Sequence, residues 1–192
     1  HNLLKLDILG HDDPTMIRTL EEYITSDALE NEYNDENPFD ATKIPLDDKK
    51  VLSLFHDTSA LGIKPEDIDG CNLGCLGIPE FGTDFVIQMV QDANPQSLSD
   101  LIRISGLSHG TNVWLGNAQV LIESGKATIS TAICTRDDIM IYLINQGVDS
   151  ALSFTIMESV RKGKGLKPEC EEAMKEKDVP DWYIWSCKQI SY

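Results

Sequence analysis

The sequence predicts a mainly α protein with one short β-strand at its N-terminus. Leu4, Leu6 and Ile8 alternate with Lys5 and Asp7, which is the two-residue period of a strand with one buried face. Through the last three quarters of the chain most apolar residues have helical spacing, and Gly, Pro, Asp or Ser bounds each such stretch. The chain contains neither an internal repeat nor a heptad register.

The first predicted helix follows the strand directly. In HDDP, Asp12 or Asp13 is a candidate N-cap and Pro14 suits the first helical turn, so we expect a helix over about residues 14–25. Capping is our preferred interpretation of these two acids, ahead of metal binding. Residues 26–40, SDALENEYNDENPFD, have many acids and few aliphatics, which predicts a mobile surface insertion that is dispensable for function.

Eight later stretches have helical spacing. They are DDKKVLSLFHDT, GTDFVIQMVQDA, SLSDLIRI, NVWLGNAQVLIES, RDDIMIYLINQG, DSALSFTIMESVRKG, KPECEEAMKEKD and PDWYIWSCKQI. A second short strand is expected near LGIPEF, residues 76–81. The rest of the chain after residue 47 therefore reads as helical.

The charge of the chain is strongly negative and unevenly distributed. A formal net charge of −16 by itself argues against a partner as anionic as nucleic acid. Ten acids and one base lie in residues 21–48, whereas RKGKGLK at 161–167 holds four bases and no acid. Bases at a helix end interact with the helix dipole, but such a concentration also suits a polyphosphate or a nucleic-acid backbone. Composition leaves both interpretations open.

The cysteines and apolar runs exclude several classes of protein. Five cysteines without C-x2-C spacing argue against a disulfide scaffold, and CNLGC with His56 lacks the fourth ligand of a structural zinc site. We expect reduced thiols. No signal peptide and no apolar run of about 20 residues is present, and the chain starts at His1, so we expect a cytoplasmic piece of a longer protein. The G-x-x-x-x-G-K-[ST] phosphate loop is absent.

Two further stretches are candidates for anion contacts. SGLSHG places the hydroxyls of Ser105 and Ser108 and the imidazole of His109 on flexible backbone just before a helix, although glycine turns are the usual alternative. Arg136 begins RDDIMIYL, where it either pairs with the two aspartates that follow or binds a ligand. Composition does not decide between them.

The chain resembles a segment of the C-family replicative DNA polymerases, in particular the PolC-type DNA polymerase III alpha chain of Gram-positive bacteria. The resemblance rests on six stretches in the order of that family: LLKLDILGHDDPTMIR, LGIPEFGTDFV, RISGLSHGTNVWLGNAQ, RDDIMIYLINQG, IMESVRKGKGL and VPDWYIWSCKQISY. It covers nearly the whole chain, apart from the acidic insertion and neighbouring loops.

The resemblance implies a palm edge strand over residues 1–13 and a fingers region over residues 14–192. It makes Asp7 the third of three catalytic aspartates and a ligand of Mg²⁺, with the other two upstream of His1. It implies a nucleotide- or DNA-binding role for seven residues: Ser105, Ser108, His109, Arg136, Arg161, Lys162 and Lys164.

The same resemblance implies a DNA-directed DNA polymerase as the parent protein. Its substrates would be dNTP and primer-template DNA, and other parts of it would bind replisome proteins such as the sliding clamp, with no membrane partner. The isolated piece is expected to be inactive. Two alternatives are a non-enzymatic helical module for nucleic-acid binding or replisome docking, and an acidic helical domain that only contacts proteins.

Overall fold

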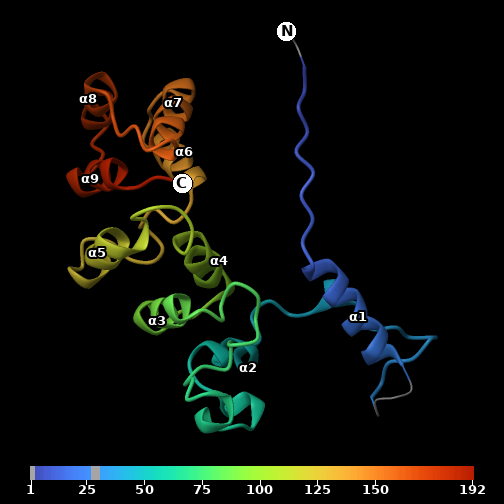
Figure 1. Cartoon of the computed structure of the whole chain (residues 1–192). Coiled ribbons are helices and arrows are strands. Elements are labelled where there is room, and N and C mark those ends of the chain that lie inside the picture. Colours follow the sequence, from blue (N-terminus) through green and yellow to red (C-terminus); the bar gives the residue numbers. More distant parts are fainter. Residues whose placement is uncertain (1–2, 27–30) are drawn as a thin grey trace. The chain divides into compact units, whose positions relative to one another are not determined.

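The computed structural model describes residues 3–26 and 31–192, and those residues are mainly helical. The chain divides into two compact units, His1–Leu46 and Asp47–Tyr192 (Figure 1). Within the described residues, no helix is both long enough and apolar enough to cross a membrane. The predicted boundary between palm and fingers, after residue 13, stays a prediction.

The first unit contains helix α1, Asp13–Thr25, which confirms the helix predicted over residues 14–25. Pro14 lies in its first turn, where the missing N–H has no helical partner to lose. The capping role predicted for Asp12 is not formed: its backbone is itself helical, with φ −74° and ψ −19°, and its side chain makes no cap hydrogen bond. A capping side chain needs extended backbone in order to reach back to the first free N–H groups.

The strand predicted around Asp7 is not formed. Residues 3–10 are extended and exposed, and Leu4, Leu6 and Ile8 expose 85%, 73% and 90% of their surface. A strand requires a hydrogen-bonded neighbour, and the described residues supply none to this segment. The alternating pattern is therefore present without the pairing and burial that would make it a strand.

The acidic segment after α1 is partly tied to that helix. The Ala41 backbone N–H donates to Glu21 Oε1 at 2.9 Å, and the Phe39 N–H donates to Thr25 Oγ1 at 3.0 Å. The Tyr33 and Phe39 rings meet edge to face, 5.1 Å apart. Residues 27–30 of the predicted mobile insertion lie outside the described residues, and its mobility stays a prediction.

Helix α1 exposes an apolar face. Met16 and Ile17 lie four and three positions before Leu20, and Tyr23 lies three after it; all four are 48–63% exposed, and α1 contains no buried residue. Contiguous exposed apolar surface of this kind is typical of an interaction site.

The second unit holds the remaining helices, and all but α4 lie inside a stretch predicted as helical (Figure 1). Their bounds are α2 Lys49–Leu52, α3 Asp84–Ala93, α4 Leu98–Leu107, α5 Gln119–Glu123, α6 Arg136–Asn145, α7 Ser150–Arg161, α8 Pro168–Glu176 and α9 Asp181–Gln189. Capping explains where five of them begin, because their N-cap side chains accept a hydrogen bond from a first-turn N–H. These caps are Asp48, Thr83, Ser97, Thr135 and Asp149. α4 continues three residues past SLSDLIRI, so the first half of SGLSHG ends a helix, where the sequence predicts flexible backbone before a helix.

Two predicted elements differ from the structure. The strand expected at LGIPEF is wrong: residues 74–81 form successive turns, in which Pro79 has no N–H to donate and Glu80 has a φ of 68°. The helix expected over residues 112–124 is interrupted at Leu115 and Gly116, and Gly116 has a φ of 70°. α5 begins only after this kink.

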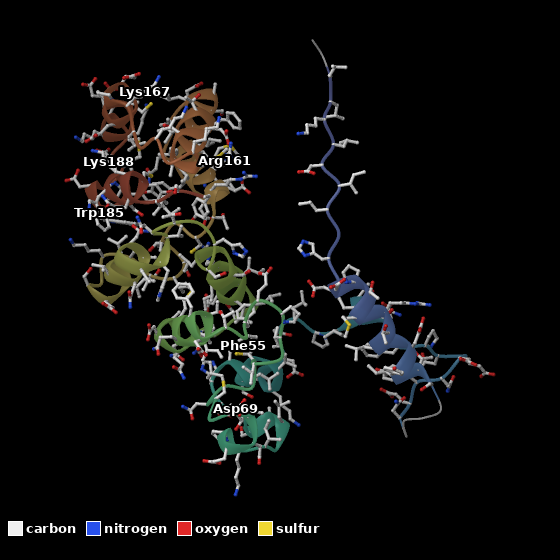
Figure 2. The ribbon with its side chains drawn as sticks, in the orientation of Figure 1. Phe55, Asp69, Arg161, Lys167, Trp185 and Lys188 are labelled. Atoms are coloured by element: carbon white, nitrogen blue, oxygen red, sulfur yellow. The ribbon has the colours of Figure 1, made fainter. Side chains whose placement is uncertain are left out.

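The core of the second unit lies along α3 to α9. Ile139 and Leu143 of α6 and Ile156 and Val160 of α7 are all fully buried. Near α2, the buried ring of Phe55 (Figure 2) packs edge to face on Phe81, with centroids 5.3 Å apart. Burial of these side chains fixes the helices whose ends carry the candidate site.

Candidate nucleotide-binding site

The end of α4 is closed by the Ser–His turn, which we define as residues 105–110. Ser108 Oγ donates to the Ser105 carbonyl at 2.7 Å, and His109 Nδ1 lies 2.6 Å from the same oxygen. Because a carbonyl oxygen only accepts, Nδ1 must carry a proton, and Nε2 of the exposed imidazole is left as the second ring nitrogen. The Ser105 hydroxyl donates to Glu80 Oε2 at 3.1 Å, so the segment of residues 74–81 also contacts the Ser–His turn.

Two glycines let other segments pack closely on this turn. A Cβ at Gly106 would clash with the carbonyl oxygen of Cys134 and would lie 2.9 Å from the methyl group of Thr135. The loop that leads into α6 therefore lies directly against the end of α4. Gly110, with a φ of 78°, lies against the Ser191 carbonyl oxygen in the same way.

The last two residues join the Ser–His turn to the end of α7. Thr111 and Ser191 pair through two backbone hydrogen bonds, of 2.8 Å and 3.1 Å. The N–H of Tyr192 donates to the Arg161 carbonyl at 3.1 Å, and a Cβ at Gly163 would lie 3.3 Å from Ser191 Cβ. The turn and the basic segment thus lie on two sides of Ser191.

The basic corner, residues 161–164, carries less free charge than its sequence suggests. Arg161 binds Glu158 through two hydrogen bonds, of 2.7 Å and 2.9 Å, and Lys162 Nζ lies 3.2 Å from the same carboxylate. Hydrogen bonds from Arg161 and then Lys162 lower the pKa of Glu158 to about 2. Lys164 is exposed, and no carboxylate within the described part of the chain lies at ion-pair distance from it. Arg161 and Lys167 are labelled in Figure 2.

Arg136 is the first residue of α6 and is exposed. The predicted alternative, pairing with the two aspartates after it, is not formed in the described structure. Asp138 instead accepts hydrogen bonds from the backbone N–H groups of Cys134 and Thr135, at 3.0 Å and 2.9 Å, and its carboxylate lies 4.0 Å from Arg103. A cation at a helix N-terminus has no favourable interaction with the helix dipole, so local structure does not explain Arg136.

The structure brings the predicted residues of the second unit into one region. The Ser–His turn contacts the segment before Arg136, and Ser191 links that turn to the basic corner. Asp7 is exposed and belongs to the other compact unit. Within the described residues no group of three or more His, Cys, Asp or Glu side chains could hold a metal ion, and CNLGC with His56 forms no such group.

Sequence reasoning missed the residues that hold the site together. Ser191 and Tyr192 end the stretch VPDWYIWSCKQISY, which carries the resemblance but does not indicate their contacts with Thr111 and Arg161, far away in the sequence. Glu80, which accepts from Ser105, lies in the stretch that the sequence predicts as a strand. No local pattern could have found either relationship.

Comparison with known proteins decides the family. The model of the family described as the bacterial DNA polymerase III alpha subunit finger domain matches residues 13–178. The chain belongs to this finger-domain family. The predicted resemblance to PolC-type DNA polymerase III is therefore confirmed, and the match also agrees with the mainly helical structure.

The finger-domain chain is similar over its whole length to several proteins described as DNA polymerase III PolC-type. It is 56% identical over 191 residues to the Bacillus subtilis (strain 168) protein, which is 100% of this chain and 12% of that protein. It is 56% identical over 190 residues to the Caldanaerobacter subterraneus protein and 52% identical over 191 residues to the Staphylococcus aureus (strain MW2) protein. Those matches cover 99% and 100% of this chain, and 13% and 12% of the relatives. The chain thus corresponds to a fragment of a PolC-type polymerase.

Proposed function

We propose that this finger region binds the phosphates of an incoming dNTP, or of primer-template DNA, within a replicative DNA-directed DNA polymerase. The binding surface would comprise the Ser–His turn, the first residue of α6 and the basic corner. The observation that carries the proposal is the junction at Ser191, which places the turn and the corner against one another. Separate helix-end cations would not need such an arrangement.

The charges of this surface suit phosphate. Lys164 and Arg136 are exposed and lack an ion-pair partner within the described residues, whereas Arg161 and Lys162 share one carboxylate. Nucleotidyl transfer builds negative charge on the phosphates, so fixed cations that are not neutralised by the protein lower its barrier. His109 of the same surface is exposed and turns its second ring nitrogen, Nε2, away from the Ser105 carbonyl.

Asp7 is proposed as a catalytic carboxylate and as one ligand of Mg²⁺ in a two-metal site. Mg²⁺ takes one or two protein carboxylates together with phosphate and water oxygens, so a single exposed aspartate fits as a contributor and not as a complete site. The bound ions would stabilise the attacking and leaving oxygens. The other carboxylates would come from residues outside this chain, and the isolated fragment would be inactive. A palm strand outside the chain would cover Leu4, Leu6 and Ile8, which are exposed here.

Steady-state primer extension with the full-length polymerase tests the phosphate surface. Lys164→Ala is expected to raise the KM for nucleotides or to weaken primer-template binding. Lys177→Ala, which removes another exposed lysine of the second unit, is the matched control and should change neither. If Lys164→Ala leaves the KM for nucleotides, the primer-template affinity and the salt dependence of that affinity unchanged, the basic corner is only a helix end.

The role of Asp7 needs a separate variant. In the full-length enzyme, Asp7→Asn is expected to retain DNA binding and to lose extension, because the amide no longer supplies a charged oxygen ligand. Primer extension by Asp7→Asn at the wild-type rate would show that Asp7 is not part of the active site.

A non-enzymatic docking role is the second candidate, and the apolar face of α1 favours it. Met16, Ile17, Leu20 and Tyr23 form a surface that another protein or another domain could cover. DNA binding that depends on neither Asp7 nor Mg²⁺, together with no extension, would support this alternative. Contacts with the sliding clamp would lie outside this chain, and the whole protein would work in the cytoplasm.

A further inference from the structure

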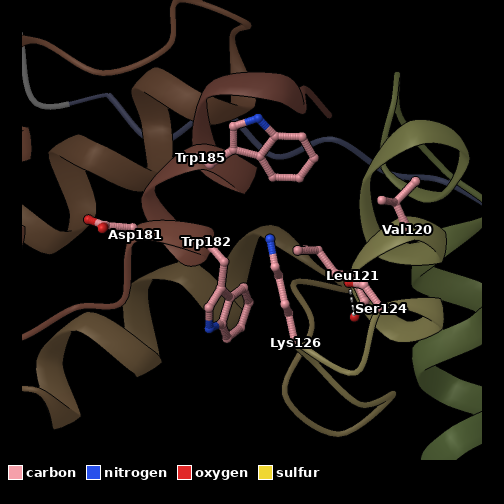
Figure 3. Close-up of a pocket in the computed structure, with 7 residues that line it drawn as sticks. All are labelled: Val120, Leu121, Ser124, Lys126, Asp181, Trp182 and Trp185. Atoms are coloured by element: carbon pink, nitrogen blue, oxygen red, sulfur yellow. Dashed lines mark hydrogen bonds between the residues drawn. The ribbon is translucent and has the colours of Figure 1, made fainter.

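A hollow of about 530 Å³ lies between α5 and α9, and its lining shares no residue with the proposed phosphate surface. Figure 3 shows its lining residues: Val120, Leu121, Ser124, Lys126, Asp181, Trp182 and Trp185. Its volume lies within the range of roughly 300–1,000 Å³ that is typical of small-ligand sites. The two indoles are three positions apart on α9 and therefore lie on one side of that helix.

The two walls of this hollow are held by a buried hydrogen bond. The Ser186 hydroxyl donates to Asn117 Oδ1 at 2.7 Å, and both residues are fully buried. Ser186 follows Trp185 directly, and Asn117 stands three positions before Val120. The spacing between the indoles and α5 is thus set by the core and does not depend on the ligand.

The hollow combines aromatic surface with an uncompensated cation. Trp185 is 37% exposed, so part of its indole is open to the hollow. The Lys126 amino group extends toward the space between the two indoles, and Asp181 directs its carboxylate away from it (Figure 3). Across the described residues, no carboxylate lies at ion-pair distance from Lys126.

We propose that this hollow binds an unpaired nucleotide of single-stranded DNA. The base would stack on Trp182 or Trp185, and its phosphate would lie at Lys126. One nucleotide supplies both a flat ring and an anion, and stacking on aromatic side chains with a cation beside the backbone is the common mode of binding to single strands. A peptide would need an aromatic side chain and a separate acidic group at the matching spacing, whereas one nucleotide carries both, which favours the nucleotide. This proposal depends on the proposed function in one respect only, which is that the single strand is the template overhang of a polymerase substrate.

Photocrosslinking with the full-length polymerase tests where the overhang lies. Primer-templates would carry one 5-iododeoxyuridine at successive positions of the 5′ template overhang, and crosslinked peptides would be identified by mass spectrometry after irradiation. We expect one or two positions to crosslink to Trp182 or Trp185. Crosslinks only to other residues, or none at any position, would overturn the proposal.

Affinity measurements with variants test the same site independently. Trp185→Ala should weaken binding of a fluorescent single-stranded overhang by about five- to one-hundredfold, as expected for the loss of one stacked base. Lys126→Met should reduce the slope of log affinity against log salt by about 0.7. Phe154→Ala and Lys177→Met, which change an exposed aromatic residue and an exposed lysine elsewhere in the second unit, are the controls and should match wild type.

Other results would overturn this inference or separate it from the proposed function. Equal overhang affinity for Trp185→Ala and Phe154→Ala overturns the proposal, and so does a hollow that binds a polyproline peptide but no oligonucleotide. If the wild-type protein extends primers but never crosslinks at the two indoles, this inference fails and the proposed function stands. If it crosslinks there without extending primers, the single-strand site stands and the proposed function fails.

Discussion

Ser186 and Asn117 form a fully buried hydrogen bond of 2.7 Å that connects α9 to the kinked segment before α5. Asn117 also donates from Nδ2 to the Val113 carbonyl at 2.9 Å, so both ends of its amide are satisfied. A buried amide with both ends paired has one orientation, which makes this contact a fixed point between two parts of the second unit.

Ser186→Ala is expected to loosen α9. The substitution leaves Asn117 Oδ1 buried without a donor, which costs about 1–3 kcal/mol. Hydrogen exchange of α9 amides in the full-length protein should accelerate by about five- to one-hundredfold wherever exchange occurs through local opening.

The matched control for Ser186→Ala is Ser153→Ala. Ser153 is equally buried, but its hydroxyl has no hydrogen-bond partner within the described residues. Its removal should therefore leave exchange in α7 unchanged or slower. Equal acceleration by both variants would show that lost volume, and not the hydrogen bond, controls α9.

Gly106→Ala should destabilise the end of α4, although alanine usually favours a helix over glycine. Alanine normally stabilises a helix by about 1 kcal/mol relative to glycine, but here the new methyl group meets the Cys134 carbonyl oxygen. The end of α4 must move away from the loop before α6, and the overpacking costs about 1–3 kcal/mol. We expect faster hydrogen exchange in α4 and a higher nucleotide KM in the full-length enzyme. Gly77→Ala is the control, because open space surrounds that position and its φ is not positive, and it should change neither measurement.

Local sequence signals predicted most of the helices but neither strand. Caps such as Thr135 and Asp149 and the apolar spacing of α6 and α7 act within a few residues, so a single sequence contains them. The strand around Asp7 depends on a pairing partner, and no described residue supplies one. The strand predicted at LGIPEF does not form, because Pro79 and the positive φ of Glu80 favour turns there despite the apolar pattern.

The candidate site was predictable only as separate pieces. The hydroxyls, imidazole and bases are visible as motifs, but the junction at Ser191 joins positions that are 80 residues apart, and no motif announces it. The same holds for the aromatic hollow: WYIW indicates a helix, and only the structure places Lys126 beside its indoles. Both the junction at Ser191 and the aromatic hollow are formed by long-range packing, which depends on the whole core.

The cysteines should differ in reactivity. Burial raises the pKa of Cys75 and Cys134 to about 11 and that of Cys187 to about 12. At pH 8 a thiol with a pKa of 11 is ionised in about one molecule in a thousand, so alkylation is slow. Cys71 is only partly buried, and we expect iodoacetamide to modify it before those three in the folded protein, as peptide mass spectrometry would show. Early labelling of Cys187 would indicate that α9 opens readily.

Glu158→Gln is expected to strengthen DNA binding. Glu158 holds both Arg161 and Lys162, so its neutralisation frees two cations of the basic corner. If these cations then reach phosphates, the slope of log affinity against log salt should become steeper by about one to two. Glu176→Gln, which removes the same charge from an exposed site at the end of α8, is the control. Equal slopes for the two variants would place the corner away from DNA.

The same ion pairs predict how stability changes in acid. Because the pKa of Glu158 is lowered from 4.5 to about 2 in the folded chain, its contribution to stability is fully present above pH 4.5. It is lost as the pH falls from 4.5 toward 2, where the carboxylate takes up its proton. The difference in Tm between wild type and Glu158→Gln should therefore shrink over that interval, whereas it should be constant above it. A difference that stays constant through pH 4.5 to 3 would mean that the carboxylate is not held by Arg161 and Lys162 in solution.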